Sequence, residues 1–184
     1  KPKKFISNSI STSFYVLDKK IFKYLKQIKK SERNEFEMPD AIKLLSKHEK
    51  IYCVAAKQWL PIGYPWDLLN ADKIIRGNKN IIGKNSKIYA EVKNSAIGDN
   101  CIVKGTVRNS IVFDKTIIDK GSIIEDSIIG ENVYFKGKII AKDSIYSVVN
   151  NKKVIVDRLG AIVGDNCKLV NVTILFVDFY GKKL

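Results

Sequence analysis

The sequence has few residues that could carry covalent or metal chemistry: 3 cysteines and a single histidine among 184 residues. Cys53, Cys101 and Cys167 lie far apart and are odd in number. No two of them have the spacing of a metal-ligand pair or a redox motif. We therefore expect neither a disulfide framework nor a zinc site, and the pattern indicates a protein of the reducing cytoplasm.

Long apolar runs are also missing, and none reaches the roughly 18 residues that a membrane-spanning helix requires. The basic start, Lys1-Pro2-Lys3-Lys4, is not followed by the apolar region of a signal peptide. Disorder is not expected, because 45 % of the residues are hydrophobic and can form a core. Since the sequence starts with lysine rather than methionine, we expect it to be a piece of a longer protein.

The formal net charge is +14, but the lysines are spread along the chain, mostly as singles or pairs such as Lys19-Lys20 and Lys29-Lys30. A nucleic-acid-binding protein would concentrate such charge in a stripe with interleaved aromatic residues. We therefore interpret the charge as a solvated basic surface and expect no nucleic-acid partner. The same charge would attract phosphorylated small molecules.

Residues 82–146 contain a repeat. It has four copies of a short Asx-Ser motif, in which Asn or Asp is followed by Ser and then by two mostly aliphatic residues: Asn94–Ile97, Asn109–Val112, Asp126–Ile129 and Asp143–Tyr146. Inside the repeat, apolar residues lie six positions apart, as in Ile82 and Ile88, Ile97 and Val103, Ile118 and Ile124, and Ile129 and Phe135. Residues six apart do not lie on the same face of an α-helix. In a coil with three flat sides, the same spacing places one inward-pointing aliphatic residue on each side. The repeat therefore predicts a parallel β-helix.

Residues 1–77 have a mixed pattern of strand and helix signals. The expected elements are a strand at 9–17, a helix after Asp18, a helix at 39–47, a strand at 51–56, an extended segment at 58–62 and a helix from Pro65 to Gly77. This order is typical of a mixed sheet with helices on its faces. Because the segment is too short to complete such a sheet, we expect the other strands upstream of Lys1.

After the repeat, the six-residue spacing is lost at residues 147–158, where we expect a loop or a hairpin with its turn at Asn150–Lys152. The repeat pattern is found again at Val163–Cys167, which is identical to Ile97–Cys101 in four of five residues. Residues 172–180 are expected to form one or two strands, with an apolar end that must be covered.

The stretch Gln58–Leu69 resembles the sugar-1-phosphate nucleotidylyltransferases, which include glucose-1-phosphate thymidylyltransferases and their archaeal two-domain relatives. In that family a motif W-x-D-x-G-x-P-x-D-L-L closes the catalytic domain and leads into a hexapeptide β-helix. Arg33–Ile42 and Arg158–Asn166 are also similar to family segments. The resemblance implies a partial α/β nucleotidyltransferase domain at residues 1–77 and an all-β, left-handed parallel β-helix at residues 81–184.

The implied reaction is attack by a sugar 1-phosphate on the α-phosphate of a nucleoside triphosphate, with release of pyrophosphate and a requirement for Mg²⁺. By resemblance, Lys1 holds the sugar phosphate, Glu35 and Glu37 accept hydrogen bonds from the sugar, and Trp59 lines its pocket. Two features depart from the family. The glycine-rich G-x-G-T-R loop is absent, and Pro61 replaces the metal-binding aspartate and offers no ligand. The β-helix is expected to form a homo-oligomer.

Two other functions remain open. Hexapeptide β-helices often carry acyltransferases, but such an enzyme would be expected to use a histidine base on the coils, and His48 lies outside them. The segment 145–150 also lacks the G-x-G-T stretch of the archaeal two-domain acetyltransferases. A non-catalytic regulatory or scaffold protein with the same two-domain plan would fit Pro61.

Overall fold

The computed structural model describes residues 7–149 and 151–175 and divides the chain into two compact units, before and after the Trp59–Leu60 bond. The first unit contains α1 (Ile21–Leu25) and α2 (Met38–Leu45). No helix in the described ranges is long and apolar enough to cross a membrane.

The two helices of the first unit form near the predicted places. Before α1, the Asp18 carboxylate accepts a hydrogen bond from the Lys20 amide at 2.9 Å. Pro39 lies in the first turn of α2, where its missing N–H costs no hydrogen bond. The helices pack through a small core of buried residues: Ile21, Tyr24, Ala41 and Leu45.

The strands predicted at 9–17 and 51–56 are wrong for this structure, because no residue of the described range 7–59 lies in a strand. Phe14, Val16 and Val54 are instead exposed to solvent. A strand exists only beside a neighbour that exchanges backbone hydrogen bonds with it, and the described residues supply no neighbour to either segment. Local β propensity alone therefore does not form these strands.

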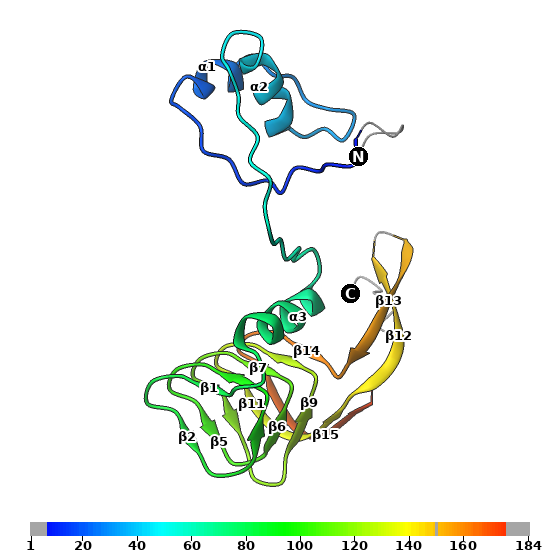
Figure 1. Ribbon diagram of the computed structural model, residues 1–184. Helices are drawn as coiled ribbons and strands as arrows, with labels where there is room; N and C mark the ends of the chain where they lie inside the picture. Colours follow the sequence, from blue (N-terminus) through cyan, green and yellow to red (C-terminus); the bar gives the residue numbers. More distant parts are fainter. Residues whose placement is uncertain (1–6, 150, 176–184) are drawn as a thin grey trace. The chain divides into compact units, whose positions relative to one another are not determined.

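The second unit is a parallel β-helix built from short strands that stack coil upon coil (Figure 1). One face has the strands β1 (Ile81–Ile82), β4 (Ala96–Ile97), β7 (Ile111–Val112), β10 (Ile128–Ile129) and β14 (Ile162–Val163). A second face has β2 (Lys87–Ile88), β5 (Ile102–Val103), β8 (Ile117–Ile118), the start of β11 (Tyr134–Ile140), and β15 (Lys168–Leu175). The third has β3 (Val92–Lys93), β6 (Thr106–Arg108), β9 (Ile123–Glu125) and the later residues of both β11 and β15, which pair with each other there.

The core of the β-helix consists of the apolar residues that the repeat places six apart. The members of the pairs Ile97 and Val103, Ile118 and Ile124, and Ile129 and Phe135 are all buried. Each coil stacks its inward side chains on those of its neighbour, since the parallel register keeps equivalent positions opposite each other, as for Ile118 and Phe135. The six-residue spacing is therefore confirmed as the signature of the core from Ile97 onward, whereas Ile82 in the first coil is exposed and Ile88 is only partly buried.

The first three copies of the Asx-Ser motif each form a corner of a coil. Asn94, Asn109 and Asp126 have φ angles of 48°, 48° and 43°, a left-handed conformation that Asn and Asp tolerate better than most residues. The serine that follows each of them is buried, and its hydroxyl accepts a hydrogen bond from a backbone amide of the next coil. These bonds run from Ser110 N to Ser95 Oγ at 3.1 Å, from Ser127 N to Ser110 Oγ at 3.0 Å and from Ala161 N to Ser127 Oγ at 3.0 Å.

The fourth copy of the motif, Asp143–Tyr146, is not part of this stack. The prediction that the repeat extends to residue 146 is therefore wrong. It lies in β12 (Lys142–Val149), which pairs antiparallel with β13 (Lys152–Leu159) as a hairpin (Figure 1). Residues 160–163 take its place in the next coil, where β14 pairs with β10. Of the loop or hairpin expected at 147–158, the structure has a hairpin, which is longer than that range and whose ladder ends at the Val149–Lys152 pair.

α3 (Pro65–Arg76) begins at the predicted proline and ends at Gly77, whose φ of 67° terminates the helix. It belongs to the same compact unit as the β-helix, and the buried Arg76 joins the two. The guanidinium donates to the carbonyl oxygen of Asn94 at 2.9 Å and pairs with Asp72 at 2.8 Å. The predicted domain boundary at residue 77 concerns the complete catalytic domain and stays a prediction.

A second corner of the coils offers a test of the stacking. Four of its five positions are asparagines with φ near 57°, namely Asn85, Asn100, Asn132 and Asn166, and the fifth is Lys115 with φ 57°. Because asparagine tolerates this conformation better than lysine, we expect Lys115→Asn to raise the free energy of unfolding by about 0.5 kcal/mol. The ion pair of Lys115 with Glu131 is exposed, so its loss costs little.

Urea unfolding of the Lys115→Asn chain measures this gain, with Lys115→Gln as the control that removes the charge but keeps an ordinary side chain at positive φ. If both variants lose the same stability, the backbone explanation of this corner is wrong.

Candidate functional site

Of the predicted substrate-binding residues, Lys1 lies outside the described residues, and Glu35, Glu37 and Trp59 lie in the first compact unit. Trp59 is exposed. Its side chain is free to contact a ligand, and its predicted place in a sugar pocket stays a prediction.

Glu37 closes the loop that leads into α2. Its Oε1 accepts hydrogen bonds from Arg33 Nη2 at 2.6 Å, Arg33 Nε at 3.2 Å and Ser31 Oγ at 2.9 Å. The hydrogen bond from Arg33, followed by that from Ser31, lowers the pKa of the Glu37 carboxyl. Glu37 is therefore ionised at neutral pH and held in one orientation by the loop.

Glu35 lies in the same loop but is held by its backbone. Its carbonyl oxygen accepts a hydrogen bond from the Ser31 amide at 2.8 Å, while its exposed side chain lies 3.7 Å from Arg33 Nη2. An exposed ion pair of this kind contributes little stability. Glu35 can therefore exchange Arg33 for a ligand more easily than Glu37 can.

The motif from Trp59 to Leu69 has a structural role that the sequence reasoning missed. Asp67 Oδ2 accepts hydrogen bonds from the amides of Gly63 and Tyr64, both at 2.8 Å. The Tyr64 ring stacks on Trp66 with a centroid distance of 4.9 Å. An acidic residue in the first turn after Pro65 was the available signal, because such a residue satisfies free amides at a helix start.

The donors for Mg²⁺ in this region do not match the family motif. Pro61 has no side-chain ligand, and Asp67 directs a carboxylate oxygen at two amides. Within residues 7–149 and 151–175, no three His, Cys, Asp or Glu side chains come together as a possible metal site. The described residues therefore do not fit a magnesium site, and no catalytic step is assigned to one.

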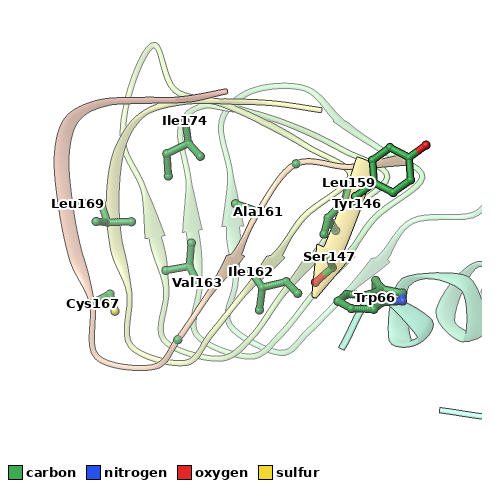
Figure 2. A pocket seen from close by; sticks show the side chains of 12 residues that line it. Trp66, Tyr146, Ser147, Leu159, Ala161, Ile162, Val163, Cys167, Leu169 and Ile174 are labelled. Atoms are coloured by element: carbon green, nitrogen blue, oxygen red, sulfur yellow. The ribbon is translucent and has the colours of Figure 1, made fainter. Parts of the chain in front are cut away.

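A cavity of about 450 Å³ lies at the last coil of the β-helix. Figure 2 shows Val163, Cys167, Leu169 and Ile174, at the inward positions of that coil, with Leu159 and Trp66 beside them. No lining residue is charged, so the cavity cannot balance the charge of a phosphate group. Its apolar lining continues the hydrophobic core of the β-helix and does not fit a nucleotide.

The coils have no histidine that could act as the base of an acyl transfer, since the single histidine of the sequence is His48. His48 comes after α2, as expected, and its ring stacks on Tyr24 with a centroid distance of 5.9 Å. Cys101 points into the core, and burial raises the pKa of its thiol, which removes it as a nucleophile.

Comparison with known proteins connects these features. Residues 1–77 match the family model for nucleotidyl transferases, and residues 78–171 match that for the GlmU-like C-terminal hexapeptide. Among the similar proteins, the bifunctional protein GlmU of Methanocaldococcus jannaschii is 31 % identical over 91 % of this chain and 53 % of its own length. The bifunctional sugar-1-phosphate nucleotidylyltransferase/acetyltransferase of Sulfurisphaera tokodaii is 28 % identical over 92 % of this chain and 55 % of its own length.

The chain thus spans about half the length of the curated relatives it matches. The order of the two matches is the order inferred from the motif at residues 58–69 and the coils that follow it. The chain belongs to the sugar-1-phosphate nucleotidylyltransferase family, as a member with a GlmU-like hexapeptide β-helix.

Proposed function

We propose that this chain is the C-terminal part of a transferase that joins a sugar 1-phosphate to a nucleoside monophosphate unit taken from a nucleoside triphosphate, with release of pyrophosphate. The observation that carries the proposal is the succession of a nucleotidyl transferase match and a GlmU-like hexapeptide match along one chain. In the proposed reaction an oxygen of the sugar phosphate attacks the α-phosphate. Such a step depends on positioning and on neutralising phosphate charge.

In this proposal the described loop before α2 binds the sugar. Glu35 accepts a hydrogen bond from a sugar hydroxyl once it leaves Arg33, and Glu37 keeps the loop closed. Trp59 supplies an apolar surface for the sugar ring, and Lys1 an ammonium group for the phosphate. The family uses a divalent metal that would neutralise phosphate charge, and in this chain Pro61 contributes nothing to it.

The β-helix serves oligomerisation in this proposal. Its outward face carries the exposed apolar residues Ile81, Phe113 and Ile162, and residues of this kind gather at subunit contacts. The proposed compartment is the cytoplasm, where free thiols such as Cys53 persist.

A non-catalytic homologue is the second candidate, and Pro61 is the observation that favours it. Acyl transfer is less well supported, because the sequence has no histidine after His48. Acetyl coenzyme A binding measured by calorimetry tests that possibility, and micromolar affinity would support it.

The deciding experiment uses the intact protein, including the part that precedes this chain. Pyrophosphate release is measured with glucose 1-phosphate or N-acetylglucosamine 1-phosphate, each of the common nucleoside triphosphates, and Mg²⁺. We expect slow formation of a nucleotide sugar, and an increase on the order of 100-fold in Pro61→Asp, because a carboxylate returns to the family's metal position.

Pro61→Asn is the control, since it removes the proline without adding a charge. If wild type and Pro61→Asp are both inactive, the transferase proposal fails and the non-catalytic candidate stands.

A further inference from the structure

The first turn of α3 packs against the hairpin that interrupts the coils. Ile145, Val156 and Leu159 form a buried cluster at the base of β12 and β13, and Trp66 and Leu69 of α3 pack against it. A two-stranded hairpin is only marginally stable by itself, so this contact supports the hairpin as well as the helix. The helix is therefore fixed at its N-terminal end by the hairpin and at its C-terminal end by Arg76.

The same turn of α3 holds the segment before it. Asp67 binds the amides of Gly63 and Tyr64, and the Tyr64 ring lies on the face of Trp66. Two hydrogen bonds to one carboxylate oxygen and a ring contact tie residues 63–64 to the helix. A displacement of Trp66 must therefore displace residues 63–64, which follow Pro61 closely in the chain.

The hairpin is in turn anchored to the coils at its base. Arg158 donates from Nε to Asp126 at 2.8 Å and from Nη1 to Asp143 at 2.8 Å. Asp126 lies at the coil corner formed by the third copy of the Asx-Ser motif, so this double ion pair connects the hairpin to the stacked coils. Hydrogen bonding to the two carboxylates raises the pKa of Arg158, which keeps its charge at any physiological pH.

We propose that the β12–β13 hairpin is an internal brace that positions residues 60–64 through Trp66. The insertion places a packing surface where the preceding coils have only a corner, and its buried residues face the helix that carries the transferase motif. The catalytic consequence rests on the proposed function: the brace sets the geometry of residues 60–64, which include Pro61 at the family's metal position. Val156 and Leu159 are then positioning residues that need not touch the substrate.

Amide hydrogen exchange on the present chain tests the brace without any need for activity. In Val156→Ala we expect the Gly63 and Tyr64 amides to exchange at least about tenfold faster, because local opening becomes easier when the packing is weakened. The Ile117 amide, bonded to Val133 O at 2.8 Å within the coils, should keep its rate. Val156→Ile should restore the protection.

Ile155→Ala is the matched control, since Ile155 is 64 % exposed on the other side of the strand and Val156 is 6 % exposed. If Ile155→Ala loosens residues 63–64 as much as Val156→Ala does, or if neither variant does so, the brace is refuted. Loss of protection at Ile117 as well would mean general destabilisation and would also refute it.

Kinetics of the intact protein then test the positioning role. Val156→Ala should raise KM for the sugar 1-phosphate by roughly 3- to 10-fold, with kcat changed less than about twofold, because fewer molecules hold the binding geometry. Equal kinetics in an active protein would refute the positioning role. If wild type and Pro61→Asp are both inactive, the proposed function fails instead, while the exchange experiment still decides whether the brace exists.

Discussion

Replacing Phe135 with alanine is expected to lower the free energy of unfolding of the β-helix by about 3–5 kcal/mol. Phe135 is fully buried, and its register places it between Ile118 of the preceding coil and Leu169 of the following one. Removal of the ring leaves a void in a stacked column whose neighbours are held by backbone ladders on three faces. Such a column cannot collapse to fill the void, so the loss should lie at the upper end of the usual range.

The control for this prediction is Phe113→Ala, which removes the same ring from an outward position that is 42 % exposed. The Phe113 amide still donates to Ile129 O at 2.9 Å, so the ladder is unaffected. We expect a change within about 0.5–1 kcal/mol by urea unfolding followed by circular dichroism. Similar losses in the two variants would contradict the assignment of Phe135 to the core.

Replacing Gly160 with alanine is expected to cost about 2–4 kcal/mol. Gly160 occupies the corner that Asn and Asp take in the preceding coils, and it brings the chain from the hairpin back to the stack. A Cβ there would collide with the carbonyl oxygen of Glu125 and the hydroxyl of Ser127. Both atoms are held in place, because the Ser127 hydroxyl donates a hydrogen bond to Glu125 O and accepts one from the Ala161 amide at 3.0 Å. The added methyl group must therefore break this bond or displace a strand.

Gly164 in the same coil provides the matched control, since a Cβ there meets no atom within 4 Å. Gly164→Ala should be neutral or slightly stabilising, because alanine restricts the unfolded chain more than glycine does. Chemical unfolding of the two variants side by side measures the difference. Equal stabilities would show that the close approach at Gly160 is not a constraint.

The predictable parts of the candidate site were those set by short-range chemistry. Pro65 at the start of a helix and Gly77 at its end follow from backbone geometry. The role of Asp67 is equally local, because its carboxylate accepts hydrogen bonds from amides three and four residues before it. The engagement of Glu37 by Arg33 and Ser31 required the three-dimensional loop, because three groups over seven residues meet only when the chain turns back.

The sequence by itself determined the β-helix, most of its inward residues and the family, and it left a loop or a hairpin open at residues 147–158. These features follow from periodicity and from residues at fixed spacing, which act within one coil or one turn. The tertiary structure decided which segments continue the stack. Asp143-Ser144 matches the repeat but lies in the hairpin, while Gly160-Ala161 does not match it and takes the corner. Stacking depends on the amide and carbonyl groups of the neighbouring coil. The four-residue motif contains no information about which segment becomes that neighbour.

The same reason explains the strands that did not form and the helix that packs on the coils. Residues 9–17 and 51–56 have β propensity, but the described chain gives their backbones no hydrogen-bonding partner. α3 was predicted as an element of the catalytic domain, and only the tertiary structure places its Trp66 against the hairpin and its Arg76 against a coil corner. Periodicity thus fixes which side chains point inward, and contacts between distant segments decide what they meet.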